Sequence, residues 1–223
     1  MSMPHGASAS MEVTLRSVTR SFGGEVVLSH LDHTLPAGSR TVLLGPNGSG
    51  KSTLIQLIAG AILPTRGQVV HRMGTEDIED GEVYRHVSIA APYLSLYKEL
   101  SLRRTIELHH RLKPLLPGLD ARTVARAACL EQALEKPVAQ FSSGMEQRAR
   151  LAIAILSDTP LLLLDEPTSN LDADGIQWYM QLVAAHVGQR TLVVASNDRQ
   201  QEFALCDRRI EVMRFKPASG KAG

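Results

Sequence analysis

The chain has 223 residues, of which 43% are hydrophobic and 21% charged, a composition typical of a globular domain with one sizeable core. Its net charge of +1 gives no overall field toward nucleic acid or anionic lipid, so we expect no nucleic-acid partner. No stretch approaches the roughly 20 apolar residues that would span a bilayer, and the two cysteines lack metal-ligand spacing, which fits a reducing compartment.

The first third of the chain predicts antiparallel strands. Residues 1–10 are small and polar, and we interpret them as a disordered lead or an expression remnant. From residue 11 onward, apolar and polar residues alternate as in a half-buried strand. Gly23-Gly24 predicts a hairpin turn before a strand at 26–35, and a further strand is predicted at 68–71. The acidic stretch at 75–82 predicts a polar loop.

A glycine-rich run follows the apolar strand predicted at 41–44. It matches the phosphate-loop pattern G-x-x-x-x-G-K-[ST] and reads Gly45-Pro46-Asn47-Gly48-Ser49-Gly50-Lys51-Ser52-Thr53. A helix-like apolar pattern comes next, so the motif has the strand and helix that it requires. Glycines let backbone N–H groups converge on phosphate oxygens, Lys51 supplies a cation, and the Ser52 hydroxyl is a Mg²⁺ ligand. The run predicts binding of a nucleoside triphosphate.

The remainder of the chain alternates helices with buried strands. After a strand at 87–90, helical spacing predicts a mostly helical insertion at about 101–135. His109 and His110 within it are predicted to be solvated on a helix surface. The elements then expected are helices at 145–156, 176–186 and about 200–205, and strands at 161–164, 191–195 and 209–213. This alternation predicts a parallel α/β sheet; residues 217–223 are predicted to fray.

Two carboxylates end the apolar run at 161–164. Asp165 is predicted to hold Mg²⁺, mostly through water, and Glu166 to polarise the water that attacks the γ-phosphate. Acidic residues at the end of a strand are weak evidence by themselves, but they gain weight from the phosphate loop in the same chain.

Four segments together resemble the ATP-binding cassette (ABC) ATPases. They are the phosphate loop, the signature run Phe141-Ser142-Ser143-Gly144-Met145-Glu146-Gln147-Arg148, the strand with its carboxylates at 161–167, and Ser169-Asn170-Leu171-Asp172. The resemblance covers about 13–213. It implies an α/β fold with a P-loop NTPase core and mostly parallel sheet, an N-terminal antiparallel β subdomain and a small α-helical subdomain at about 92–145, all in one domain at 11–216.

The resemblance also implies how the site is completed. The signature residues Ser142, Ser143, Gly144 and Met145 are expected to contact the γ-phosphate of ATP held by another subunit, so the active unit is a head-to-tail homodimer or heterodimer. Phe22 is expected to stack on adenine, and Asp172 is the D-loop residue. The implied cofactors are ATP and Mg²⁺, the implied partners are transmembrane permease subunits, and the implied place is the cytoplasmic face of the membrane.

Three positions depart from the family's pattern. Ala91 or Pro92 stands where a glutamine usually ends the strand before the helical insertion, and proline offers no side-chain donor. Met145 replaces the signature glutamine. Asn197 replaces the switch histidine, so it donates a hydrogen bond but does not titrate near neutral pH. We expect an active ATPase of low intrinsic rate, with Lys51, Glu166 and Asn197 as catalytic residues.

Other functions stay open on these residues. The leading hypothesis is the nucleotide-binding subunit of an ABC transporter, which drives transport through separate membrane subunits. Asn197 and Pro92 support a regulatory module in which ATP-dependent dimerisation is the signal and hydrolysis is weak. A different phosphate-loop enzyme, such as a kinase, is a third possibility, and the signature run argues against it.

Overall fold

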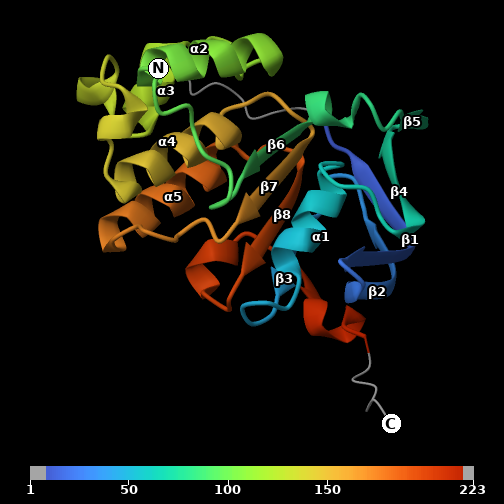
Figure 1. Cartoon of the computed structure of the whole chain (residues 1–223). Helices are drawn as coiled ribbons and strands as arrows, with labels where there is room; N and C mark the ends of the chain where they lie inside the picture. Colours follow the sequence, from blue (N-terminus) through green and yellow to red (C-terminus); the bar gives the residue numbers. More distant parts are fainter. Residues whose placement is uncertain (1–8, 218–223) are drawn as a thin grey trace.

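The computed structural model describes residues 9–217, which form two sheets and the helices around them (Figure 1). Residues 1–8 of the lead predicted at 1–10 and residues 218–223 of the tail predicted at 217–223 lie outside the described residues. The antiparallel sheet has the order β2-β1-β4-β5 and consists of β1 (Glu12–Phe22), β2 (Glu25–Leu35), β4 (Arg66–Met73) and β5 (Glu76–Ile78). The parallel sheet has the order β6-β7-β8-β3-β9 and consists of β3 (Arg40–Leu44), β6 (Val87–Ala90), β7 (Leu161–Asp165), β8 (Thr191–Ser196) and β9 (Arg208–Glu211). The predicted α/β fold with two sheets is confirmed.

The antiparallel sheet begins with the hairpin of β1 and β2. Val13 and Leu15 of β1 are buried, while the residues between them are partly exposed, as the period of two along a strand requires. The prediction of a polar loop at 75–82 is wrong over β5. Asp77 pairs with Arg72 of β4, and their side chains form an ion pair of 2.7 Å between Arg72 Nε and Asp77 Oδ1. β5 forms because its backbone pairs with β4. The acidic local sequence gave no sign of this pairing.

The central strands β3, β7 and β8 of the parallel sheet are buried on both faces, whereas the edge strand β9 is mostly exposed. The helices beside it are α1 (Lys51–Ile58), α4 (Ser143–Ile155) and α5 (Ala173–His186). Leu162 and Leu164 of β7 pack in one apolar cluster with α4 and α5, and Leu161 and Leu163 pack in the other with α1. Because these strands run parallel, the residues that follow β3, β7 and β8 meet at one edge of the sheet.

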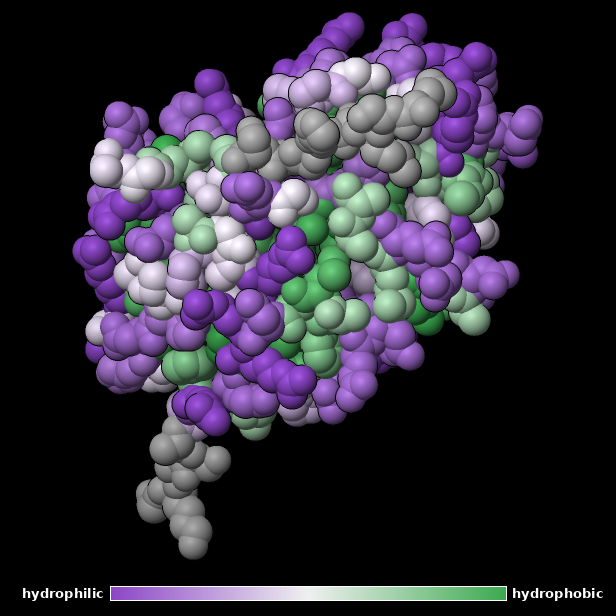
Figure 2. Space-filling view, turned by 180° about the vertical axis from the view of Figure 1, so that it is seen from behind, coloured by the Kyte–Doolittle hydropathy of each residue, from purple (hydrophilic) through white to green (hydrophobic). Residues whose placement is uncertain are grey.

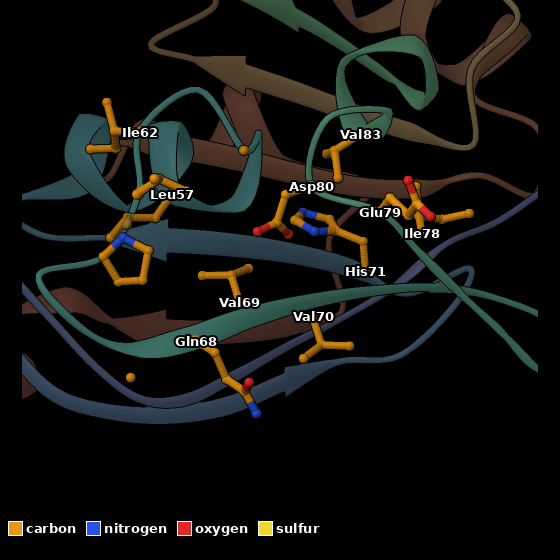
Figure 3. Close-up of a pocket in the computed structure, with 14 residues that line it drawn as sticks. Leu57, Ile62, Gln68, Val69, Val70, His71, Ile78, Glu79, Asp80 and Val83 are labelled. Atoms are coloured by element: carbon orange, nitrogen blue, oxygen red, sulfur yellow. The ribbon is translucent and has the colours of Figure 1, made fainter.

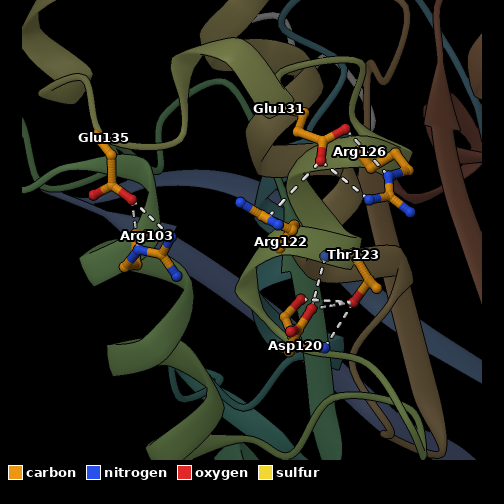
Figure 4. Close-up of polar contacts among 7 residues, drawn as sticks. All are labelled: Arg103, Asp120, Arg122, Thr123, Arg126, Glu131 and Glu135. Carbon is orange, nitrogen blue, oxygen red and sulfur yellow. Dashed lines mark hydrogen bonds and ion pairs between the residues drawn. The ribbon is translucent and has the colours of Figure 1, made fainter.

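The helical insertion contains α2 (Leu102–Leu112), α3 (Ala121–Ala127) and short 3₁₀ turns at Glu131–Ala133 and Val138–Gln140. Asp120 caps α3, because its Oδ1 accepts a hydrogen bond of 2.8 Å from the Thr123 amide. Figure 4 shows this cap beside three ion pairs, in which Glu131 binds Arg122 and Arg126, and Arg103 of α2 binds Glu135. The pair of Arg103 with Glu135 joins α2 to the turn after α3.

The prediction of a solvated histidine pair is wrong for His109. Its Nε2 lies 2.7 Å from Ser157 Oγ, just after α4, and burial lowers its pKa to about 4. Helical spacing alone could not predict the contact between His109 and Ser157, because α4 is distant in sequence from α2, against which it packs. His110 is exposed, and its Nδ1 accepts a hydrogen bond from the Leu115 amide at 3.0 Å.

A cavity of about 450 Å³ separates α1 from β4 (Figure 3). His71 of β4 lies in its wall, and His71 Nε2 donates a hydrogen bond of 2.7 Å to the carbonyl of Ile58, at the end of α1. The cavity contains none of the residues predicted for the site. Figure 2 shows the opposite face of the molecule, where a strip of apolar side chains is surrounded by polar ones. Within residues 9–217, the helices are all too short or too polar to cross a bilayer.

Candidate functional site

The phosphate loop connects β3 to α1, as predicted. Gly50 precedes the helix with φ of 101°, a left-handed conformation that residues with a Cβ rarely adopt. No side chain caps the first turn of α1, so its backbone N–H groups remain free to bind an anion. The hollow beside the loop has a volume of about 480 Å³, and its lining includes Asn47, Gly48, Ser52 and Thr53.

The Lys51 side chain is held inside the loop. It is only 5% exposed, and its Nζ donates hydrogen bonds to the carbonyls of Gly45 at 2.8 Å and Pro46 at 3.2 Å. It also donates to Oδ1 of Asn197. These contacts place a cation in the hollow and leave it surrounded by neutral oxygens, which a phosphate oxygen can replace.

Asn197 joins the phosphate loop to Glu166. Its Nδ2 donates to Glu166 Oε1 at 2.9 Å and to Asn47 Oδ1 at 2.7 Å. The structure therefore brings together four predicted residues at the same edge of the sheet: Lys51 and Asn197 donate, and Asn47 and Glu166 accept. A single carboxamide makes all these contacts because it carries both a donor and an acceptor.

Glu166 lies just beyond β7 in an unusual backbone conformation. Its φ is 46°, which is in the left-handed region, and its amide donates to the Ala195 carbonyl of β8 at 2.9 Å. Strained backbone of this kind persists where the surrounding structure holds it, and it often occurs at functional sites. Here it directs the carboxylate toward Asn197 and the hollow.

Asp165 carries a buried carboxylate next to the Ser52 hydroxyl. It is 1% exposed, and neither of its oxygens makes a hydrogen bond of normal geometry among the described residues, although Ser52 interacts with it. Burial raises its pKa, and the nearby Ser52 hydroxyl and Lys51 ammonium oppose that rise. A buried charge is costly unless it is paired, so this group fits a cation. No group of three or more histidine, cysteine or acidic side chains within 9–217 is arranged to hold a metal. Mg²⁺ does not need one, because it uses one or two carboxylates together with phosphate oxygens and water.

The signature residues lie at the start of α4. Ser142 caps this helix, and its Oγ accepts a hydrogen bond of 3.2 Å from the Met145 amide. Asp172 caps α5 in the same way, through Gly175 at 2.8 Å. Ser142, Gly144, Met145 and Asp172 line a hollow of about 770 Å³ that shares no residue with the hollow beside the phosphate loop. The structure thus groups these residues but keeps them apart from Lys51.

Phe22 lies at the end of β1, next to the hairpin turn. Its side chain is 45% exposed, so it is not a core residue, and the Arg20 guanidinium lies 4.2 Å from the centre of its ring. One face of the ring therefore packs on a cation. Stacking of Phe22 on adenine stays a prediction.

Tyr93 was not predicted for the site, but it lies close to it. Ala91 is buried, Pro92 is exposed, and neither offers a side-chain donor in place of the missing glutamine. The Tyr93 hydroxyl is close enough to Asp165 to interact electrostatically with its carboxylate. Tyr93 is 42% exposed, and the partial burial of its hydroxyl and that charge raise the pKa of Tyr93 to about 12, against the effect of a hydrogen bond with Gln56. Its position, one residue after Pro92, was the only signal in the sequence.

Glu25 of β2 and Lys216 also line the phosphate-loop hollow. They escaped prediction because neither belongs to a motif. Only the folding of β2 and the C-terminal segment against the loop brings them there.

Comparisons with known proteins agree with this site. The family model for ABC transporters matches residues 28–169. Nod factor export ATP-binding protein I of Rhizobium johnstonii is 29% identical over 217 residues, covering 93% of this chain and 68% of that protein. The Fe(3+) ions import ATP-binding protein FbpC of Vibrio cholerae is 33% identical over 204 residues, covering 87% of this chain and 57% of that protein.

The fold agrees as well. The dimeric structure of MJ0796, a bacterial ABC transporter cassette, has a TM-score of 0.75 and 25% sequence identity, covering 89% of this chain and 93% of that chain. The family match includes the phosphate loop and Asp165 with Glu166, whose geometry is described above. The chain therefore belongs to the ABC transporter family, as an ATP-binding ATPase cassette.

Proposed function

We propose that the chain is the ATP-hydrolysing subunit of an ABC transporter and acts on separate transmembrane permease subunits at the cytoplasmic face of the membrane. The observation that carries the proposal is the cluster in which Asn197 contacts Lys51, Asn47 and Glu166. It combines a cation for the phosphates with a carboxylate for the attacking water at one edge of the sheet.

Each residue then has a defined task. The phosphate loop, 45–53, holds the β- and γ-phosphates through its backbone amides and Lys51. Ser52 and, mostly through water, Asp165 would hold Mg²⁺, which supplies positive charge to the phosphate oxygens. Glu166 orients the water, and Asn197 donates to a γ-phosphate oxygen. Phe22 stacks on the adenine.

The proposed active unit is a head-to-tail dimer. The signature hollow and the phosphate-loop hollow are separate within one chain. A second chain would supply Ser142, Ser143, Gly144 and Met145 to the ATP held by the first. The amides at the start of α4 suit a γ-phosphate, as at other helix N-termini.

A regulatory module is the second candidate. Asn197, Pro92 and Met145 favour it, because each departs from the pattern of the family's active members. In that case ATP binding and dimerisation would be the output, and hydrolysis would be incidental.

The test is steady-state ATP hydrolysis with Mg²⁺, measured together with ATP-dependent dimerisation. We expect turnover in the parent chain, no turnover in Glu166→Gln, and an ATP-dependent dimer of that variant. Glu135→Gln is the matched control, because the side chain of Glu135 is 69% exposed and pairs only with Arg103 in the helical part. ATP binding with no turnover in the parent, with or without a permease, would favour the regulatory module.

A further inference from the structure

Glu202 is a buried acidic residue that belongs to none of the motifs described above. It lies in a short 3₁₀ helix, η4 (Gln200–Phe203), that follows β8, and it is 4% exposed. The ion pairs among residues 9–217 do not include it. Burying a carboxylate without a cation costs free energy, so other groups must stabilise Glu202 in this position.

Neutral donors from two different loops hold the carboxylate. Oε1 accepts hydrogen bonds from Thr168 Oγ1 at 2.5 Å and from the Thr168 amide at 3.3 Å. Oε2 accepts from the hydroxyl of Ser196. Thr168 and Ser196 are both almost completely buried, so these bonds are shielded from water.

The two donors lie beside the catalytic pair. Thr168 follows Glu166 by two residues, and Ser196 immediately precedes Asn197. Beyond these anchor points the loops meet again, where Asn197 Nδ2 donates to Glu166 Oε1 at 2.9 Å. The carboxylate of Glu202 therefore connects the same two loops from the buried side.

Glu202 is itself fixed from two directions. Tyr179 of α5 donates from its hydroxyl to the backbone carbonyl of Glu202 at 2.8 Å. The amide of Arg199 donates to Ser196 Oγ at 3.1 Å, which orients that hydroxyl toward Glu202. A rigid acceptor with two oxygens then sets the separation of Thr168 and Ser196.

We propose that Glu202 is a positioning residue for ATP hydrolysis, which holds Thr168 and Ser196 so that Asn197 meets Glu166 in the geometry for attack on the γ-phosphate. The inference rests on the roles proposed above for Glu166 and Asn197. Placement errors of about 1 Å at a reacting group cost on the order of a hundredfold in rate, so a distant anchor has a measurable effect.

The test is a double-mutant cycle of Glu202→Gln and Asn197→Ala, with kcat and the Kd for ATP measured for the full chain with Mg²⁺. Glutamine keeps one acceptor oxygen but replaces the other with an NH₂ group that cannot accept from Ser196. We expect kcat to fall about tenfold or more while Kd changes by less than about threefold. In the Asn197→Ala background, the same change should have almost no further effect, because the contact that Glu202 positions is already lost.

Matched controls separate positioning from folding. Gln201→Ala changes an exposed neighbour in the same 3₁₀ helix and should leave kcat unchanged. Thr168→Val and Ser196→Ala each remove one of the two hydroxyl hydrogen-bond donors to Glu202 and should each lower kcat. They keep the proposal testable if Glu202→Gln fails to fold. Amide hydrogen exchange supplies a readout independent of turnover, with faster exchange expected in both loops of Glu202→Gln at an almost unchanged Tm.

Two results would overturn the inference. Losses from Glu202→Gln and Asn197→Ala that simply multiply would show that Glu202 acts without Asn197, and parallel losses of kcat and ATP affinity would show a purely structural role. Unchanged turnover in Glu166→Gln is a separate failure, because it would remove the proposed catalytic carboxylate itself.

Discussion

Asn197 Nδ2 lies 2.9 Å from Glu166 Oε1, and the Oδ1 of the same carboxamide accepts a hydrogen bond from Lys51. The contact links the group proposed to orient water to the group that binds phosphate. A carboxamide keeps its donor and acceptor at every physiological pH, whereas an imidazole gains and loses a proton near pH 6.5. This difference leads to the first prediction.

Asn197→His should make hydrolysis depend on pH where the parent shows little dependence. The new imidazole titrates between about pH 6 and 7, so kcat should change across that range, while the parent stays nearly level. Asn197→Ala should lower kcat about a hundredfold with ATP still bound, because it removes one positioned donor. Profiles of kcat from pH 5.5 to 8.5 for the three proteins test both statements, and a level profile for the histidine variant would contradict the first.

Asp165→Asn should stabilise the nucleotide-free protein while abolishing hydrolysis. The substitution removes a carboxylate whose charged form is disfavoured by burial and by the neighbouring Glu166, so Tm without nucleotide should rise by about 2–4 °C. The effect of Mg²⁺ on ATP affinity should shrink at the same time. Thermal unfolding in EDTA and ATP titrations with and without Mg²⁺ provide the measurement. Asp158→Asn, at an exposed position, is the control, and an unchanged Mg²⁺ effect would remove Asp165 from the metal site.

Tyr93→Phe should lower kcat by about three- to tenfold and leave ATP affinity unchanged. The loss corresponds to one neutral hydrogen bond near Asp165, which contributes about 0.5–1.5 kcal/mol. Because the pKa of Tyr93 is raised to about 12, its hydroxyl stays protonated, and the fold-loss should be the same from pH 6 to 9. Tyr97→Phe, at a side chain that is 60% exposed, is the matched control. Equal activity of Tyr93→Phe and the parent would exclude a role for the hydroxyl.

His109 should make the protein less stable in acid. Its pKa is about 4 in the folded chain, against 6.5 in the unfolded chain, so the unfolded state binds more protons between these values. The contribution of His109 to the free energy of unfolding should therefore be constant above pH 6.5 and fall as pH drops toward 4. Denaturant unfolding at several pH values measures this, and His109→Gln should flatten part of the slope. An unchanged slope in His109→Gln would contradict the prediction.

Local patterns predicted most of the elements around the phosphate loop. The strand at 87–90 has the predicted bounds of β6, and the strands at 161–164 and 191–195 each extend by one residue in the structure. Apolar runs between helices predict these strands correctly because both faces of a parallel sheet are usually buried, so its strands are apolar throughout. The motif at 45–53 lies directly between an apolar strand and an apolar helix pattern, so the loop could be located from this part of the sequence alone.

The failures have two physical causes. The contact of His109 with Ser157 and the approach of Tyr93 to Asp165 depend on partners distant in sequence. The strand β5 instead pairs with β4 just before it in the chain, and its acidic side chains gave no apolar alternation from which to predict a strand. The motifs predicted that Lys51, Glu166 and Asn197 lie in one site, but not that a single carboxamide would join them. Glu202 went unnoticed for the same reason, since a lone acidic residue in a polar stretch reads as exposed.

The contacts of Lys51 with the carbonyls of Gly45 and Pro46 have a thermodynamic consequence. These contacts hold the phosphate loop through its own lysine and need no nucleotide, so we expect that binding does not have to supply the conformational entropy of folding the loop. ATP association should then show only the small negative heat-capacity change of burying the nucleotide itself, without the larger contribution that accompanies the folding of a loop. Changes in the cellular ATP concentration would then alter how often the hollow is occupied, but they would not unfold the phosphate loop that lines it.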